Sequence, residues 1–313
     1  MSNQPISIII LSFNRKNEII KTIEDLKSQT YGNFEIIVVD QASTDGATAL
    51  LQDRFPEINL IRLYKNIGVG GGRNVGAMNA KGEILVFIDN DASLAHNALE
   101  MIAKRFTCPG NEKIGIIGFK IINTSTGELQ MNAWGYSGNR IMNIDKDSYV
   151  HIFPGGGSAI RKEAFEQLGY YWDELFFTAE EADLSIRALA AGYDILYSPE
   201  ILLYHRASDE KRTHKGLRDC LTLRNMLWIL WRDMPRGYSI VESFVRIVQY
   251  FIRAIRRGYF FKMLVYFLGS FSKIGLLFNN RYRISGAALR RYKHLLYRGS
   301  TLEQMRYLFF DKT

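Results

Sequence analysis

The sequence predicts an α/β fold in which a doubly wound, mostly parallel sheet carries helices on both faces, followed by a basic, amphipathic helical region. Short runs of β-branched residues alternate with helical stretches through the first two hundred residues, the pattern of consecutive βαβ units. From about residue 215 a helical periodicity replaces this alternation. We therefore expect a sheet domain at 1–212 and a helical region at 213–313.

The elements can be followed in order along the chain. Strands are expected at 6–13, 34–40, 58–64, 83–89 and 193–199, and helices at 16–28, 46–54, 70–80, 161–168 and from 178 onward. A loop-rich region covers 122–150, and a glycine turn follows at 153–159. Open α/β sheets bind ligands outside the carboxyl ends of their strands. Candidate site residues are therefore the polar residues at such ends: Asp40, Asn66, Asp89 and Asp91.

The helical region differs from the rest of the chain in charge. Residues 211–313 hold 21 Lys and Arg against 5 Asp and Glu, whereas residues 1–210 hold 19 against 27. Such a tail predicts a polyanionic partner, either nucleic acid or an anionic membrane surface. Its cations share helices with large aliphatic faces, so we expect a membrane surface and no nucleic acid. The alternative is a helical layer packed on the sheet domain or on a second subunit of a homo-oligomer.

Three further features limit the setting of the protein. The longest uncharged run in the tail, "MLVYFLGSFS", has ten residues, against about 20 apolar residues for a membrane span. The two cysteines, Cys108 and Cys220, lack the spacing of a zinc site or a redox pair. The N-terminus lacks the layout of a secretory signal. We expect a cytoplasmic protein.

The stretch "VFIDNDAS" ends an apolar run with two carboxylates, Asp89 and Asp91. Paired carboxylates at a strand end suit Mg²⁺, which completes its shell with water and substrate phosphates. The alternative is that one aspartate caps the next helix and the other is solvated.

Two other loops carry groups that suit a nucleotide. The stretch "NIGVGGGRNVG" at 66–76 has glycines where a backbone can approach a phosphate, with Arg73 as a charge partner, although neither the dinucleotide-binding nor the P-loop register is present. The alternative is a glycine-rich turn between a strand and a helix. Asp40, followed by Ser43 and Asp45, either holds a base and ribose or caps the next helix.

Taken in order, these stretches resemble the family 2 glycosyltransferases, inverting enzymes with the GT-A fold, and especially their bacterial rhamnosyltransferase-like members. The resemblance covers about 5–206. It rests on "SFNR", "VVDQASTDG", "NIGVGGGRNVG", "IDND", "FPGGGSAIRKEAFEQLGYYWDELFF", "EEADLSIRALAAGY" and "YH", in the order the family has them.

The resemblance implies roles for particular residues. It implies a metal site for Mg²⁺ or Mn²⁺ at Asp89, Asp91 and His205, although His205 alone also reads as a surface histidine at a strand end. It places Gly155, Gly156 and Gly157 beside the donor sugar or the acceptor. The expected nucleotide-sugar contacts are Ser12, Asn14, Arg15, Asp40, Ser43, Asp45, Asn66, Gly68, Arg73, Asn74, Asp89 and Asn90.

The catalytic base is expected in the stretch E-E-A-D, where Glu181 stands in place of the family's usual aspartate, with Glu180 and Asp183 as alternatives. The extra methylene moves the carboxylate by about an ångström, a scale that matters for catalysis. Thr178 to Glu181 also matches the capping box of a helix N-terminus.

The resemblance implies transfer of a hexose, rhamnose among the candidates, from a TDP- or UDP-sugar to a hydroxyl of a glycan or lipid-linked acceptor. The expected setting is synthesis of cell-surface polysaccharide at the inner face of the cell membrane. One alternative is a nucleotidyltransferase using the same metal and diphosphate, which would release pyrophosphate. Another is a nucleic-acid-binding protein acting through the basic tail.

Overall fold

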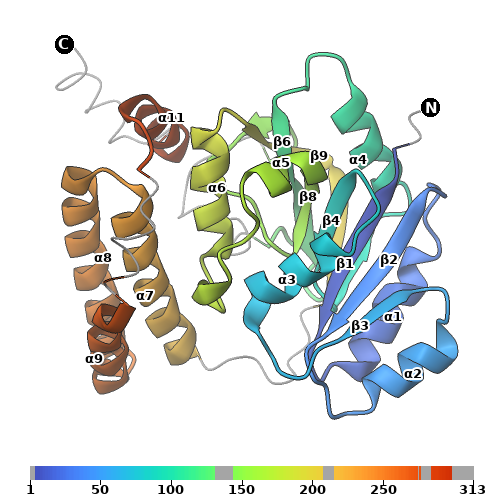
Figure 1. Ribbon diagram of the computed structural model, residues 1–313, viewed down its shortest axis with the longest axis horizontal. Helices are drawn as coiled ribbons and strands as arrows, with labels where there is room; N and C mark the ends of the chain where they lie inside the picture. Colours follow the sequence, from blue (N-terminus) through green and yellow to red (C-terminus); the bar gives the residue numbers. More distant parts are fainter. Residues whose placement is uncertain (1–3, 131–143, 207–214, 274, 276–282, 298–313) are drawn as a thin grey trace.

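Figure 1 shows the computed structural model of the chain. It describes residues 4–130, 144–206, 215–273, 275 and 283–297. The expected boundary at 212/213 and part of the loop-rich region at 122–150 lie outside the described residues.

One half of the sheet is parallel, as expected. Its strands follow the order β3-β2-β1-β4. They are β1 (Ile6–Ser12), β2 (Phe34–Asp40), β3 (Asn59–Arg62) and β4 (Ile84–Ile88). β1, β2 and β4 are almost wholly buried because helices cover both faces. In register, Ser12 at the end of β1 lies beside Asp40 at the end of β2.

The second half of the sheet is mixed. β8 (Gly157–Arg161) runs antiparallel between β4 and β6 (Ile114–Asn123), and β9 (Asp194–His205) pairs in parallel with β6. β5 (Ala92–Leu94) and β7 (Ser148–Tyr149) pair antiparallel with β9. The carboxyl ends of β1, β2, β4 and β9 therefore lie at the same edge of the sheet.

Helices cover the two faces and enclose separate cores. On one face lie α1 (Lys16–Leu26), α2 (Ala47–Arg54) and α4 (Ala98–Thr107). On the other lie α3 (Gly68–Met78), α5 (Lys162–Gln167), the short helix η2 (Asp173–Leu175) and α6 (Glu180–Ala190). The predicted α/β class, a central sheet with helices on both faces, is thus confirmed, although the sheet is mixed where a mostly parallel one was expected.

The elements predicted from the sequence differ from those of the structure between residues 92 and 161. The prediction did not identify β5, α4 or β6, and it treated 153–159 as a turn although β8 begins at Gly157. Gly115 and Gly118 interrupt the β-branched run of β6, which obscures the strand pattern. Each glycine is there for close packing, since a Cβ would come within 2.9 Å of Tyr193 at Gly115 and of Pro154 at Gly118.

The C-terminal region forms α7 (Lys215–Asp233), α8 (Arg236–Arg256), α9 (Phe260–Gly269), η3 (Ser270–Lys273) and α11 (Gly286–Tyr297). α7 lies between α6 and α8 (Figure 1). Trp228, Ile229 and Leu230 of α7 join the core that covers α6, and α11 also packs on α6. Among the described residues, no helix is both long and apolar enough to cross a membrane.

Candidate functional site

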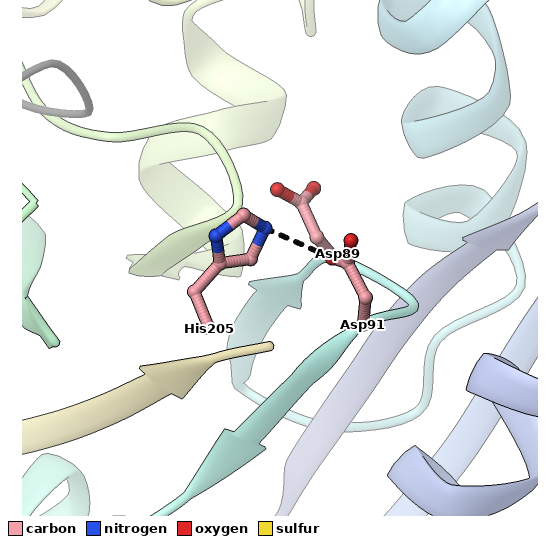
Figure 2. A group of neighbouring side chains, drawn as sticks. All are labelled: Asp89, Asp91 and His205. Atoms are coloured by element: carbon pink, nitrogen blue, oxygen red, sulfur yellow. Dashed lines mark ion pairs between the residues drawn. The ribbon is translucent and has the colours of Figure 1, made fainter. Parts of the chain in front are cut away.

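The two aspartates after β4 meet a histidine from the end of β9. β5 follows them and pairs antiparallel with β9, so that Ala92 lies opposite His205. His205 Nε2 lies 3.0 Å from Asp91 Oδ1, and the Arg206 backbone N–H donates to the Asp91 carbonyl at 2.8 Å. Figure 2 shows Asp89, Asp91 and His205 together, and one ligand atom from each lies within 4.8 Å of the others.

A strand, β5, follows the aspartates, and α4 begins later, at Ala98. The alternative in which one aspartate caps the next helix is therefore wrong. The pKa of the Asp91 carboxyl is lowered, because the hydrogen bond and charge of His205 outweigh the opposing effect of burial. The pKa of Asp89 is raised by withdrawal from bulk water and by Asp91, against the effect of Arg73, although 53% of its side-chain surface is exposed.

A buried arginine joins this acidic pair to the start of α6. Arg73 of α3 is 5% exposed. Its guanidinium lies 3.6 Å from Asp89 Oδ1, 3.6 Å from Glu180 Oε1 and 3.3 Å from Glu181 Oε1. Burial alone would lower the pKa of Arg73, but Tyr171 and these carboxylates raise it. One cation thus links the aspartate pair to both glutamates.

The three candidate bases on α6 differ in what they can reach. The side chain of Glu181 is 21% exposed, that of Glu180 is 5% exposed, and that of Asp183 is fully buried. Asp183 accepts from Arg187 at 2.5 Å and also from Arg232. Burial and the charge of Glu181 raise the pKa of Glu180 to about 8. Glu181 is therefore the carboxylate best placed to meet an acceptor from solvent.

The capping box predicted at Thr178 to Glu181 is wrong. The N-cap of α6 is Ala179, and it makes no side-chain cap hydrogen bond. Thr178 and Ala179 have φ of 69° and 67°, so the chain enters the helix from the left-handed region. The Thr222 hydroxyl donates to the Thr178 hydroxyl at 3.1 Å, and the Glu181 carboxylate pairs with Arg73. Glu181 is thus available for another role.

The glycine loop before β8 lies directly against these acids. A Cβ at Gly155 would overlap the Glu181 carboxylate, and a Cβ at Gly156 would overlap the Asp89 carboxylate. Gly157, the first residue of β8, instead faces Ile121. Glycine at positions 155 and 156 therefore leaves the space that the Glu181 and Asp89 carboxylates occupy.

The loops that follow β1 and β2 are tied to each other. The Asn14 backbone N–H donates to Ser43 Oγ at 2.9 Å, and the Thr44 N–H donates to Asn14 Oδ1 at 2.8 Å. Asp45 accepts the backbone N–H groups of Lys16 and Ala47. The predicted residues Asn14, Ser43 and Asp45 thus lie on one surface, which these two loops form at the sheet edge.

Asp40 is buried at the base of this surface. Its Oδ2 accepts from the Ser43 N–H at 3.2 Å and from the Thr48 hydroxyl at 3.1 Å, while its Oδ1 is buried without a hydrogen-bond partner. The backbone at the start of α2 is bound by Asp45. Asp40 therefore does not act as the simple helix cap that was the alternative.

The remaining predicted nucleotide contacts have structural partners. Asn66 Oδ1 accepts from the Gly68 N–H, Asn90 donates to the Leu11 carbonyl, and the Asn74 amide pairs with both the N–H and the carbonyl of Tyr171. A Cβ at Gly68 would overlap the Phe176 backbone. The glycines of α3 thus serve close packing, and contact of these residues with a nucleotide stays a prediction.

Three residues near the site had not been predicted. Gln41 accepts the Ile67 N–H at the start of α3, and Arg206 ties the end of β9 to α1 through Asp25 at 2.8 Å. Asn225 of α7 donates to the loop before α6. Gln41 directly follows Asp40 and Arg206 directly follows His205, so their positions in the sequence could have marked both as site residues. Nothing in the sequence marked Asn225.

The model of the glycosyl transferase family 2 matches residues 7–169. The matched part includes Arg73, Asp89 and Asp91, whereas Glu181 and His205 lie beyond it. The chain belongs to glycosyl transferase family 2 and so to the glycosyltransferases.

Relatives and solved structures agree with this assignment. The UDP-Glc:alpha-D-GlcNAc-diphosphoundecaprenol beta-1,3-glucosyltransferase WfaP of Escherichia coli is 38% identical over 88 residues, covering 28% of this chain and 35% of that protein. The succinoglycan biosynthesis protein ExoO of Rhizobium meliloti is 27% identical over 127 residues, covering 40% and 36%. The chain thus spans about a third of the length of these two relatives.

The mannosyltransferase PcManGT from Pyrobaculum calidifontis, solved in complex with GDP-Man and Mn²⁺, has a similar fold. Its TM-score is 0.57 at 16% identity, covering 99% of this chain and 88% of that chain. At this level of identity the likeness shows the fold alone, and it agrees with the expected GT-A architecture.

Proposed function

We propose that the chain is an inverting glycosyltransferase that moves a hexose, rhamnose among the candidates, from a TDP- or UDP-sugar to a hydroxyl of a glycan or lipid-linked acceptor. One observation carries the proposal: the Glu181 carboxylate and the Asp89, Asp91 and His205 cluster lie at one sheet edge, joined by Arg73. In this proposal Glu181 serves as the base and the cluster holds the diphosphate.

The donor set of the cluster fits a divalent cation. Two carboxylates and an imidazole converge there, and Asp91 is held ionised by His205. An imidazole nitrogen beside carboxylates suits Mn²⁺ better than Mg²⁺, which prefers an all-oxygen shell. Bound there, the cation would neutralise the charge of the leaving nucleoside diphosphate.

Glu181 accepts the proton of the acceptor hydroxyl as that oxygen attacks the anomeric carbon. Its carboxylate lies 3.3 Å from Arg73 and is partly exposed, so an acceptor hydroxyl can reach it from solvent. Glu180, with a pKa of about 8, is mostly protonated at neutral pH and adds little repulsion. A single displacement by the acceptor inverts the anomeric configuration, and no side chain needs to form a covalent intermediate.

The tied loops after β1 and β2 are proposed to hold the nucleoside, with Asp40 at their base. The buried, unpartnered Asp40 Oδ1 supports this, because buried polar atoms in native proteins are rarely left unsatisfied. The relative WfaP is named for UDP-Glc and the similar structure holds GDP-Man, so neighbouring proteins use different nucleotides. The proposed setting is cell-surface polysaccharide synthesis, as the name of ExoO suggests.

The protein is proposed to work at the inner face of the cell membrane through α8. This helix carries a strip of exposed apolar side chains, the α8 strip, formed by Ile240, Val241, Phe244, Val248, Ile252 and Ile255. Glu242 lies off the strip and pairs with Arg246. Arg253 and Arg257, near the end of the helix, instead pair with Asp219 of α7. The exposed apolar area of the strip therefore carries the proposed membrane contact.

The donor and the reaction class are tested with a panel of nucleotide sugars and Mn²⁺ or Mg²⁺. A donor at 100 times its Kd stabilises the protein by about 2.7 kcal/mol, which thermal unfolding detects. Turnover should release a nucleoside diphosphate. Release of pyrophosphate would show a nucleotidyltransferase instead, and absence of both binding and turnover across the panel would overturn the proposal.

The membrane contact is tested by vesicle co-sedimentation of the full chain. Truncation at 212 is unsuitable, because it would uncover the core beneath α7. The double variant Phe244→Ser, Ile255→Ser should lose binding to phosphatidylglycerol vesicles, whereas Gln249→Ser, an exposed position off the strip, should retain it. Equal binding by both variants would refute the proposal, as would a dimer that depends on the strip without vesicle binding.

A further inference from the structure

The loop that leads into α6 has an unusual backbone. Phe176, Thr178 and Ala179 have φ of 61°, 69° and 67°, and none is a glycine. Non-glycine residues adopt this left-handed region rarely, and they persist there only when the surroundings hold them. The next two residues are Glu180 and Glu181, so whatever holds the loop also sets the position of the proposed base.

One buried amide of α7 bonds three carbonyls of this loop. Asn225 Nδ2 lies 2.9 Å from the Leu175 carbonyl, 2.9 Å from that of Phe177 and 2.8 Å from that of Thr178. The Asn225 Oδ1 accepts from Arg224 Nε at 2.9 Å, which fixes the orientation of the amide. Asn225 is fully buried, so water cannot replace these bonds.

Further contacts join the same elements. Arg224 donates to the Leu175 carbonyl at 3.1 Å, and Arg232 of α7 pairs with Asp183 in the first turn of α6. From the opposite side, the Val69 N–H donates to the Phe176 carbonyl at 2.7 Å, at the start of the helix that carries Arg73. The loop is thus held between α3 and α7.

We infer that Asn225 is a positioning residue for Glu181, and that α7 is therefore part of the catalytic unit. Asn225 is fully buried and acts through the 175–179 loop, which sets where α6 begins. Without its amide, three carbonyls lose their shared donor and the left-handed backbone loses its support. The Glu181 carboxylate then moves relative to Arg73 and Asp89. This inference rests on the proposed role of Glu181 as the base.

The test is Asn225→Asp in the full chain, because aspartate keeps the shape but removes the amide donor. Ser239→Ala is the matched control: its buried hydroxyl bonds the Leu230 carbonyl of α7 at 2.6 Å and does not touch the loop. In Asn225→Asp, kcat for nucleoside diphosphate release should fall about 10- to 100-fold with donor KM within about twofold. Ser239→Ala should keep kcat within about twofold of the native value, even if its melting temperature falls as much as that of Asn225→Asp.

A second readout does not need turnover. Amide hydrogen exchange in residues 176–183 should speed up at least about tenfold in Asn225→Asp and stay unchanged in Ser239→Ala. If no donor is turned over, the proposed function fails, while exchange still decides whether α7 holds the loop. Unchanged exchange, or a loss of kcat no larger than in the control, would overturn the inference. If Asn225→Asp does not fold, Arg224→Met, which loses the Leu175 bond, takes its place with the same criteria.

Discussion

Replacing Glu181 by glutamine separates chemistry from structure at this site. Glutamine has nearly the same volume and keeps an oxygen for Arg73, which lies 3.3 Å from Glu181 Oε1. The side chain makes no cap hydrogen bond and is partly exposed. Substitutions of this kind usually change the free energy of unfolding by less than about 0.5 kcal/mol. We therefore expect the melting temperature of Glu181→Gln to stay within about 2 °C of the native value.

Turnover should respond very differently. Glutamine cannot accept a proton at neutral pH, and loss of a general base slows reactions by about 10² to 10⁴, equivalent to about 2.7 to 5.4 kcal/mol in the barrier. The residues of the proposed metal and nucleotide sites are untouched, so donor KM should stay within about threefold. The assay is nucleoside diphosphate release at saturating donor and acceptor.

Glu180→Gln provides the comparison one residue away. With its pKa near 8, Glu180 is mostly protonated at neutral pH, and its removal should lower kcat less than about tenfold. Near-normal turnover of Glu181→Gln would refute the assignment of the base. A larger loss in Glu180→Gln than in Glu181→Gln would move the role to Glu180.

Three other predictions concern the acidic residues of this site. Asp91→Asn should abolish stimulation of turnover by Mn²⁺ with a melting temperature near native, and full metal-dependent activity in a Mn²⁺ titration would contradict the metal site. Gly156→Ala should raise the Mn²⁺ concentration for half-maximal turnover by about 10- to 100-fold, because the new methyl group displaces the Asp89 carboxylate; an unchanged titration would show that this carboxylate is dispensable. Because the pKa of Glu180 is raised, the folded state binds more protons than the unfolded state between pH 4.5 and about 8, so the stability of the protein should fall as pH rises through that window. The melting temperature of Glu180→Gln should depend less on pH in this range. An identical dependence of the melting temperature on pH in both proteins would contradict the raised pKa.

The sequence predicted the sheet edge and the acids on it because both are local features. A β-branched run that ends in Asp89 and Asp91 identifies a strand and its polar end without knowledge of the rest of the chain. His205 meets Asp91 only because β5 pairs with β9, and β5 is too short to be recognised from its three residues. That contact depends on pairing between distant segments.

The competing roles of Glu181 could not be resolved from residue types. Thr178 to Glu181 fits a capping box by composition, and the backbone excludes it because Thr178 and Ala179 have left-handed φ and the N-cap makes no side-chain bond. Asn225 gave no signal, since one asparagine in a long helix is usually solvated. Its role depends on the packing of α7 against the 175–179 loop.

The tail illustrates how one pattern can serve two purposes. Amphipathic periodicity predicted either a membrane surface or a packed helical layer, and α7 and α11 pack on the sheet domain, whereas α8 leaves its apolar strip exposed. Periodicity shows that a helix has an apolar face, but not what covers it.

The anomeric configuration of the first-formed product tests the central claim most directly. NMR spectroscopy of the transfer product, recorded before any spontaneous change at the anomeric carbon, compares its configuration with that of the donor. A single displacement assisted by Glu181 predicts the opposite configuration at that carbon. A product that keeps the donor configuration would contradict the account, because retention requires a step that a lone general base does not supply.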